Sequence, residues 1–377
     1  MNGRTWTRRQ TLQGVAASLL CGTGLRALGS GNRLVLGQSA AFTGPAAQLG
    51  IQMNLGARTY FDAVNAAGGI DGRTIELQTL DDGYEPDRCE ANTKKLIDAG
   101  VFALFGYVGT PTSLMALPLA NEARVPFFAP FTGAQGLREP FSRYAFHVRA
   151  SYFDETAEIV KHVTSLGMGK IAVFYQNDSY GKAGLAGVTR ALEARNLKPA
   201  ALGTVERNTV AVGDAVAAIV KERPDAVVQI SAYRSCAAFI REARRAGYGG
   251  TFYNVSFVGT KALADELGPD SRGVVVSQVV PYPFAAVSGL SREYLAASRT
   301  AGAEPNYSSM EGYLAAKVFC EGLKRMRGGN GAEAFVTALE SIDTGFGGFN
   351  VSFGPRKHTG STFVDLTMLA EYGKVRR

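Results

Sequence analysis

The sequence is poor in the residues that build disulfide frameworks and metal sites. It has four cysteines and three histidines, and neither type recurs at C-x-x-C or metal-ligand spacing. Long hydrophobic runs are missing too, because no segment after residue 30 reaches the roughly 18 uninterrupted apolar residues of a membrane-spanning helix. We therefore expect a soluble mature chain without a metal site or cofactor, in which Cys89, Cys236 and Cys320 are small buried residues of helices.

Acidic residues are absent from the first 29 positions, which carry four arginines. The formal net charge of +7 therefore falls to +3 for the rest of the chain. The sequence also has no basic stripe with interleaved aromatic residues, the pattern typical of nucleic-acid-binding surfaces. We expect no nucleic-acid partner.

The N-terminal residues look like an export signal. Residues 7–12 contain the pair Arg8-Arg9 of a twin-arginine signal, and the apolar stretch after them is too short and glycine-rich to span a bilayer. Small residues up to Gly29 offer a cleavage site, so we predict that residues 1–29 are removed and that the mature chain starts near Ser30. Lipidation at Cys21 is the alternative, although the bulky residue before it disfavours such a site.

The remaining chain alternates between strand-like and helix-like segments. With 377 residues it is too long for one ordinary core, so two domains are expected. Short loops separate the alternating segments from residue 33 to residue 147, and the same pattern restarts there and continues to residue 280. The sequence therefore predicts an α/β fold of two lobes, each a doubly wound, mostly parallel sheet with helices on both faces, and a cleft between the lobes.

Residues 101–133 are the most informative segment. The apolar runs 101–108 and 125–129 are long enough for buried strands, and between them a helix is expected with Thr110 as its N-cap and Pro111 at its first position. A helix N-terminus at the carboxyl edge of a parallel sheet favours an anionic ligand group. The alternative interpretation is that Thr110 only caps its helix.

A set of short motifs, in this order along the chain, resembles the leucine/isoleucine/valine-binding family of periplasmic substrate-binding proteins. The resemblance covers nearly the whole mature chain, and the ordered set is more specific than any one motif. The motifs are AFTGP at 41–45, NAAGGIDGR at 65–73, DDGYEP at 81–86, NDSYG at 177–181 and AY at 232–233.

The resemblance implies a type I periplasmic-binding-protein fold with a hinge of several crossing strands. It assigns residues 30–147 and 281–350 to lobe one, and residues 148–280 and 351–377 to lobe two. It also implies a periplasmic monomer that closes on a small-molecule ligand and delivers it to an ABC permease at the inner membrane. A branched-chain amino acid is the ligand that the family would bind by default.

Compared position by position, this sequence matches some residues of the family's ligand site and departs from it at others. Thr110 matches the family's carboxylate-binding hydroxyl, and Tyr180 and Tyr233 match aromatic residues that close over the ligand from lobe two. The family's second hydroxyl has moved by one position, because Thr132 precedes the expected place and Gly133 occupies it. Tyr84 and Gly109 stand where founding members have a disulfide.

The family's acidic residue, which pairs with the substrate ammonium, aligns with Ser256. Burying an ammonium without a counter-charge costs several kcal/mol. Either Asp154, Glu155 or Asp178 supplies the charge instead, or the ligand has no ammonium and is an aromatic or aliphatic carboxylate. Aromatic residues near predicted loop edges could surround such a ligand, although about half of them are expected in the core; they are Phe42, Tyr107, Phe131, Tyr152, Phe153, Tyr180, Tyr233 and Tyr282.

Two other functions fit parts of the sequence. Ser179 and Lys182 match the S-x-x-K motif of serine hydrolases, but the S-D-N and K-T-G partner motifs are absent, so we expect no enzymatic activity. A ligand-sensing flytrap that reports to a membrane receptor or sensor kinase would have the same fold and site. The sequence alone leaves importer and sensor open.

Overall fold

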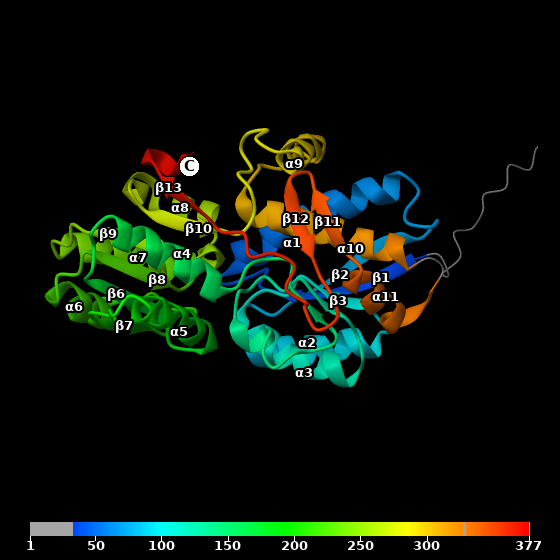
Figure 1. Cartoon of the computed structure of the whole chain (residues 1–377), viewed down its shortest axis with the longest axis horizontal. Helices are drawn as coiled ribbons and strands as arrows, with labels where there is room; N and C mark the ends of the chain where they lie inside the picture. Colours follow the sequence, from blue (N-terminus) through cyan, green and yellow to red (C-terminus); the bar gives the residue numbers. More distant parts are fainter. Residues whose placement is uncertain (1–32, 327–328, 377) are drawn as a thin grey trace, which may run out of the picture.

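The computed structural model describes residues 33–326 and 329–376, which form two α/β lobes side by side (Figure 1). Lobe one is built on a five-stranded parallel sheet in the order β2-β1-β3-β4-β5, and lobe two on a seven-stranded sheet in the order β14-β13-β10-β9-β8-β6-β7. The two-lobed α/β prediction is confirmed. The predicted signal, residues 1–29, lies outside the described residues.

Lobe one follows the alternation that the sequence predicts. α2 and α3 cover one face of its sheet, while α1 packs with α10, a helix from much later in the chain, on the other (Figure 1). Its first part contains β1 (Arg33–Ala40), α1 (Ala47–Ala66), β2 (Thr74–Asp81), α2 (Pro86–Asp98), β3 (Ala103–Phe105), α3 (Thr110–Glu122), β4 (Phe127–Phe128), a 3-10 turn (Gln135–Leu137) and β5 (Ala145–Phe146). Its later part contains α9 (Gly289–Thr300), α10 (Tyr307–Arg325), α11 (Gly331–Glu340), β11 (Asp343–Phe346) and β12 (Phe349–Ser352).

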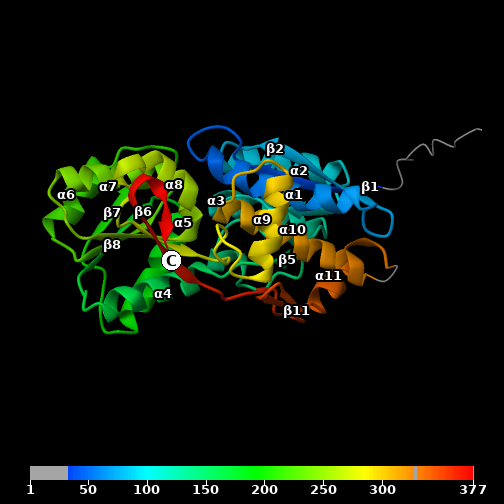
Figure 2. The same cartoon turned by 90° about the horizontal axis from the view of Figure 1, so that it is seen from above.

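Lobe two has a core of fully buried central strands, since every residue of β8 is buried. α4 and α5 pack together on one side, and α6, α7 and α8 on the other (Figure 2). Its elements are α4 (Tyr152–Ser165), β6 (Ile171–Gln176), α5 (Ser179–Glu193), β7 (Leu202–Val205), α6 (Gly213–Lys221), β8 (Ala226–Ile230), α7 (Tyr233–Arg245), β9 (Thr251–Asn254), 3-10 turns at Ser256–Val258 and Gly268–Ser271, α8 (Thr260–Leu267), β10 (Val275–Gln278), β13 (Asp365–Leu369), a 3-10 turn (Glu371–Gly373) and β14 (Val375–Arg376).

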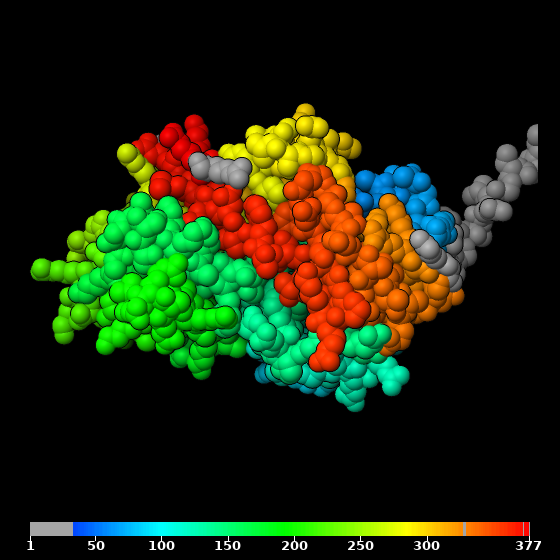
Figure 3. All heavy atoms as spheres, viewed as in Figure 1, coloured from blue at the N-terminus to red at the C-terminus, as the bar shows by residue number. Residues whose placement is uncertain are grey.

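The chain passes between the lobes in the segments 147–151, 279–288 and 353–364. The first and third segments pair with each other, because His147 N–H donates to His358 O at 2.8 Å and Gly360 N–H donates to His147 O at 2.7 Å. The third segment then runs along the surface across the junction of the lobes (Figure 3). It ends in β13 and β14, which join the sheet of lobe two in antiparallel fashion.

Local details differ from the prediction around residue 110. α3 begins at Thr110 itself and its N-cap is Gly109, so the prediction of Thr110 as N-cap is wrong. Gly109 has φ +105°, a conformation that suits glycine, and this turn lets the chain enter the helix one residue early. The preceding strand is also shorter than predicted, because only residues 103–105 pair as β3.

The cysteines behave as expected, since Cys89, Cys236 and Cys320 are buried free thiols within α2, α7 and α10. Burial raises the pKa of all three thiols. None of the helices in the described ranges combines the length and apolarity needed to span a bilayer. The same residues contain no group of His, Cys, Asp and Glu side chains that could hold a metal ion.

Candidate ligand-binding site

Three hydroxyl groups meet where the carboxyl edge of the lobe-one sheet faces lobe two. Thr110 starts α3, Thr132 follows β4, and Tyr152 starts α4 of lobe two. Thr110 Oγ1 and Thr132 Oγ1 are 2.7 Å apart, and Thr132 Oγ1 lies 3.2 Å from Tyr152 Oη. All three side chains are at most 1% exposed, so this hydroxyl chain is reached from solvent only when the lobes separate.

The hydroxyl chain has one more O–H than its internal hydrogen bonds use. Three hydroxyls carry three protons, but only two hydrogen bonds join them, and Thr132 Oγ1 also accepts from Ala134 N–H at 3.3 Å. Among the described residues no further acceptor is hydrogen-bonded to this chain, so one O–H is left to donate. Such a donor suits an anionic oxygen, because hydrogen bonds to a charged acceptor are stronger than neutral ones.

Gly133 leaves the space that Tyr152 occupies. A Cβ atom at position 133 would lie 2.6 Å from Tyr152 Cδ1 and 2.7 Å from Tyr152 N. The Gly133 carbonyl instead accepts the Tyr152 N–H at 2.7 Å, which fixes the start of α4 against this loop. A threonine cannot occupy this position while the Tyr152 ring lies there.

Aromatic rings from both lobes surround the hydroxyl chain and form what we call the aromatic cluster. Its ring centroids lie between 4.6 and 5.9 Å apart, spacings at which aromatic pairs attract each other, and all five rings are buried. The members are Tyr84 and Phe131 from lobe one and Tyr152, Tyr180 and Phe257 from lobe two. The Tyr84 ring also fills the space beside Gly109, where a Cβ would come within 2.2 Å of Tyr84 Cε2.

A buried ionic group borders the aromatic cluster and joins the lobes. The Arg149 guanidinium lies 5.4 Å from the Phe131 ring centroid, and its Nη2 is 2.8 Å from Glu155 of α4. Its Nη1 is 3.3 Å from Glu311 of α10, so Arg149 pairs with one carboxylate from each lobe. Burial raises the pKa of Glu311 to about 7, although the positive charge of Arg149 opposes that shift.

Glu155 is hydrogen-bonded to Ser256, the residue that the sequence predicts to stand in place of an acid. Its Oε2 accepts from Ser256 N–H at 2.7 Å and from Ser277 Oγ at 2.6 Å. Its Oε1 accepts from Arg149 Nη2 at 2.8 Å and from Ser256 Oγ at 3.1 Å, and Arg149 also donates to Ser256 Oγ. A carboxylate has about four acceptor sites, so Glu155 is fully hydrogen-bonded within the protein.

Asp178 and Asp154, the other two acids that could supply a counter-charge for a ligand ammonium, both take part in helix caps. Asp178 is the N-cap of α5, where its Oδ1 accepts from Tyr180 N–H at 2.9 Å. Asp154 Oδ2 accepts from the N–H of Ser151 at 2.9 Å in the capping box of α4. These carboxylates are therefore engaged by backbone donors.

A rim contact closes the lobes over the site. Glu85 of lobe one accepts from Arg207 Nη2 and from Asn208 Nδ2 of lobe two, both at 2.7 Å. Gln176 Nε2 of β6 also donates to Tyr84 Oη at 3.3 Å, which ties the aromatic cluster to the lobe-two sheet.

The structure brings together most, but not all, of the residues that the sequence proposes for the site. Thr110, Phe131, Thr132, Gly133, Tyr180 and Ser256 lie at the hydroxyl chain, the aromatic cluster or the ionic group. Tyr233 of α7 lies instead near the backbone of Gln48 in α1 of lobe one.

Three other proposed residues lie apart from these groups. Tyr107 packs on Phe127 within lobe one, with its hydroxyl 3.1 Å from Thr93 Oγ1. Phe42 is half-buried in the loop after β1, where its N–H donates to Asp81 at 2.8 Å. Tyr282 lies in the crossing segment 279–288 and donates to Val375 O at 3.0 Å.

The sequence reasoning did not single out Arg149, Phe257 or Glu311. Each is an isolated residue without a motif of its own, and Glu311 is 162 positions from Arg149. The hydrolase interpretation gains no support from local geometry, because no hydrogen bond links Ser179 to the exposed Lys182 among the described residues.

Two α/β lobes closed over a buried hydroxyl chain define a two-lobed ligand-binding protein. A sequence model described as periplasmic binding protein matches residues 34–370. A possible leucine/isoleucine/valine-binding protein from Rhodopirellula baltica SH 1 is 34% identical, with a TM-score of 0.88 over 92% of this chain and 96% of that one. A substrate-binding periplasmic protein from Ralstonia solanacearum is 30% identical, with a TM-score of 0.85 over 91% and 99% of the two chains.

The sequence similarity extends to the Leu/Ile/Val-binding protein homolog 8 of Brucella abortus (strain 2308), which is 26% identical over 343 residues, 83% of this chain and 82% of the relative. The chain therefore belongs to the periplasmic binding protein family, as a type I member of the Leu/Ile/Val-binding type. The relatives are binding proteins, and members of this family bind small molecules and work with ABC transporters.

Proposed function

We propose that this protein is the periplasmic solute-binding component of an ABC importer and that it closes on a small carboxylate. The hydroxyl chain carries this proposal, because Thr110, Thr132 and Tyr152 together have one more O–H donor than their mutual hydrogen bonds use. A ligand carboxylate would accept a hydrogen bond from that O–H beside the N-terminus of α3, where the helix dipole also favours negative charge.

The body of the ligand is expected to be apolar. The hydroxyl chain is bordered by the rings of Phe131, Tyr180 and Phe257, which have their hydrophobic faces at the junction of the lobes. An aromatic or branched aliphatic group would replace ring–ring contacts by ring–ligand contacts of similar kind. Closure would then bury the ligand between surfaces that both lobes supply.

We infer further that the ligand has no ammonium group. Glu155 reaches Ser256, but its four acceptor sites are filled and the charge of Arg149 compensates its own. An ammonium there would have to displace protein donors and would approach the Arg149 cation, which costs free energy in a buried site. A branched-chain amino acid, the ligand in the names of several relatives, is the alternative.

The importer partner and the periplasmic location rest on the family and on residues 1–29. A protein that presents two lobes to a permease can act as a monomer, and lobe closure is the signal that the permease would read. No enzymatic step is part of this proposal.

The proposal is tested with ligands that differ only in the amine. We would measure thermal stability and calorimetric binding of residues 30–377, stripped of co-purified ligand, with leucine against 4-methylpentanoate and with phenylalanine against 3-phenylpropanoate. The amides of the two acids serve as controls without the carboxylate. A ligand at 100 times its Kd adds about 2.7 kcal/mol of stability, which raises Tm clearly.

We expect at least one acid to bind and its amide to fail. Binding by the amino acid but not by its matched acid would contradict the absence of an ammonium, and would point to rearrangement of the Arg149–Glu155 pair. Equal binding of acid and amide would overturn the carboxylate itself. Thr132→Val should weaken binding of the acid, because it breaks the hydroxyl chain while nearly keeping side-chain volume.

A further inference from the structure

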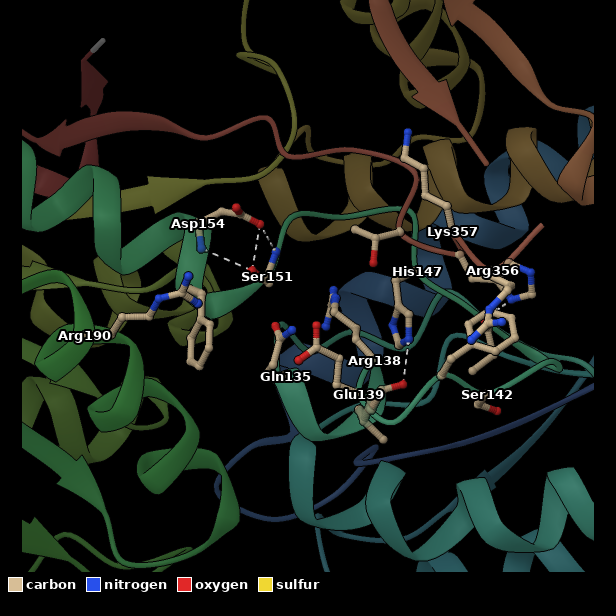
Figure 4. A pocket seen from close by; sticks show the side chains of 16 residues that line it. Gln135, Arg138, Glu139, Ser142, His147, Ser151, Asp154, Arg190, Arg356 and Lys357 are labelled. Atoms are coloured by element: carbon tan, nitrogen blue, oxygen red, sulfur yellow. Dashed lines mark hydrogen bonds between the residues drawn. The ribbon is translucent and has the colours of Figure 1, made fainter. Parts of the chain in front are cut away.

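A second candidate site lies at the lobe junction, separate from the hydroxyl chain. It is a cavity of about 490 Å³ that we call the front cavity (Figure 4). Its walls come from residues 135–147 of lobe one, from the start of α4 and Arg190 of α5 in lobe two, and from residues 356–359 of the returning chain. The crossing segment 149–151 lies between the front cavity and the ligand site, since Arg138 at the cavity wall donates to Arg149 O at 3.2 Å.

The lining of the front cavity is positively charged. Four cations line it against two acids, Glu139 and Asp154, and Asp154 is already engaged in the capping box of α4. Within the described residues, none of the four cations forms an ion pair with a carboxylate. The cations are Arg138, Arg190, Arg356 and Lys357.

Arg138 is the cation for which this lack of a partner matters most. Its guanidinium donates only to neutral backbone carbonyls, at 3.0 Å to Ala134 O and 3.2 Å to Arg149 O, and its buried Nε has no hydrogen-bond partner. Burial lowers the pKa of Arg138 to about 10, so it remains a cation at neutral pH. Asp154 and Glu155 act on Arg138 only through space, since neither carboxylate lies within ion-pair distance of its guanidinium. Partial desolvation of a cation without a directly paired carboxylate costs free energy, which an anion in the cavity would offset.

Arg190 supplies a second cation from the opposite lobe. The Cζ atom of its guanidinium lies 5.0 Å from the centroid of the Phe153 ring. The side chain approaches the cavity from lobe two, across from Arg138 and Gln135 (Figure 4). An anion between Arg138 and Arg190 would thus contact both lobes at once.

His147 adds an unsatisfied acceptor to the cavity wall. Its ring is 2% exposed, and its Nε2 lies 3.0 Å from Leu137 O, which can only accept. Nε2 therefore carries the proton, and Nδ1 is an acceptor that has no hydrogen-bond partner. Burial lowers the pKa of His147, so the ring stays neutral and Nδ1 stays an acceptor at neutral pH. A ligand that offers one O–H as well as negative charge would match this wall.

We propose that the front cavity binds a small dianion that also carries a hydroxyl group, held by Arg138 and Arg190 and donating its O–H to His147. Inorganic hydrogenphosphate and a hydroxydicarboxylate such as malate share this chemistry. The site goes beyond the proposed carboxylate site and does not depend on it, because the two are formed by different side chains.

The test uses calorimetry on residues 30–377 at low ionic strength. The probes are inorganic phosphate and malate, each matched with a dianion that lacks the hydroxyl, sulfate for phosphate and succinate for malate. We expect saturable one-to-one binding of phosphate or malate, and whichever binds identifies the source of the dianion. We expect its matched dianion to bind roughly tenfold more weakly, since it leaves the His147 acceptor unpaired.

Variants separate a built site from general attraction to a basic protein. Arg190→Gln/Arg356→Gln should lower the affinity at least roughly tenfold, the loss expected for charge-assisted hydrogen bonds. The matched control Lys198→Gln/Lys221→Gln removes the same charge from exposed positions of lobe two outside the cavity, and should keep the affinity within about twofold. Thr132→Val should leave binding of the dianion unchanged.

Three results would overturn the proposal. They are the absence of saturable binding by both phosphate and malate, an equal loss of affinity in the cavity variant and its control, and loss of dianion binding in Thr132→Val. Equal affinity for hydroxylated and matched dianions would remove the role of His147. The first two results leave the 4-methylpentanoate and 3-phenylpropanoate experiment untouched, so the front cavity can fail while the carboxylate site stands. Loss of dianion binding in Thr132→Val would instead assign the dianion to the hydroxyl chain.

Discussion

At the scale of single residues, Gly133 decides how the hydroxyl chain is built. An alanine there would place its Cβ 2.6 Å from the Tyr152 ring and 2.7 Å from the Tyr152 backbone nitrogen. The ring could rotate away, but the backbone of α4 cannot, so we expect Gly133→Ala to cost about 1–3 kcal/mol of unfolding free energy. It should also weaken ligand binding strongly, because Tyr152 supplies one of the hydroxyls.

The nearby Gly136 provides the control for this prediction. A Cβ at position 136 meets nothing closer than Leu114 Cδ2 at 3.8 Å, an ordinary contact. Urea denaturation and calorimetry of Gly136→Ala should therefore give values close to those of the original protein. Equal stability of the two variants would show that the start of α4 can move, and that Tyr152 is not fixed by this contact.

The residues of the site differ in how far the sequence could predict them. Thr110 and Tyr180 follow strands within recognisable motifs, so the sequence could place them at a sheet edge. Arg149 and Glu311 carry no such signal, because a single arginine in a crossing segment and a single glutamate in a helix are normally solvated. Only the fold shows that they meet, since their pairing depends on how α10 returns to lobe one.

At the scale of secondary structure, the N-cap of α5 connects helix stability to the site. Asp178 accepts from Tyr180 N–H, and the Tyr180 ring lies in the aromatic cluster. We expect Asp178→Ala to lose about 1 kcal/mol of stability, as N-cap removal generally does. It should also weaken ligand binding, because Tyr180 is positioned by this cap.

Ser288→Ala is the matched control, because Ser288 caps α9 by accepting from Ser291 N–H at 3.0 Å, away from the aromatic cluster. The two variants should lose similar stability in urea denaturation, while only Asp178→Ala should lower affinity in calorimetry. If both variants bind the ligand as tightly as the original protein, the cap does not position Tyr180.

Long elements were easier to predict than short ones. The strand β1 and the helices α1 and α10 follow from clear patterns in the sequence. The sequence did not predict α6, α8 and α11, because helices of 8 to 10 residues contain too few turns for a periodic apolar face to be recognised. The antiparallel addition of β13 to β10 could not be predicted from local pattern either, since it is decided by tertiary contacts.

At the scale of the whole molecule, the stability of the closed protein should depend on the protonation of Glu311. Its pKa is raised to about 7 from the ordinary value of 4.5 by burial, so between these pH values the folded protein keeps a proton that the unfolded chain has lost. The contribution of Glu311 to the free energy of unfolding is therefore highest below about pH 4.5 and is lost as the pH rises to about 7. The full change is about 3 kcal/mol, at 1.36 kcal/mol per unit of pKa shift.

The comparison with Glu311→Gln isolates this effect from the other titrating groups. We expect the stability of the original protein relative to that of the variant to fall between about pH 4.5 and pH 7 in urea denaturation. Parallel stability curves over this range would contradict the prediction. They would mean that Arg149 holds Glu311 ionised throughout.

The rim contact between Glu85 and the pair Arg207 and Asn208 has a kinetic consequence. With the hydroxyl chain buried at 1% exposure or less, a ligand held there could leave only after the lobes separate. The dissociation rate can then be no faster than lobe separation, whatever the number of hydrogen bonds to the ligand. A permease that pulls Glu85 away from its partners would act as a catalyst of release: it would shorten the residence time of the ligand without touching it.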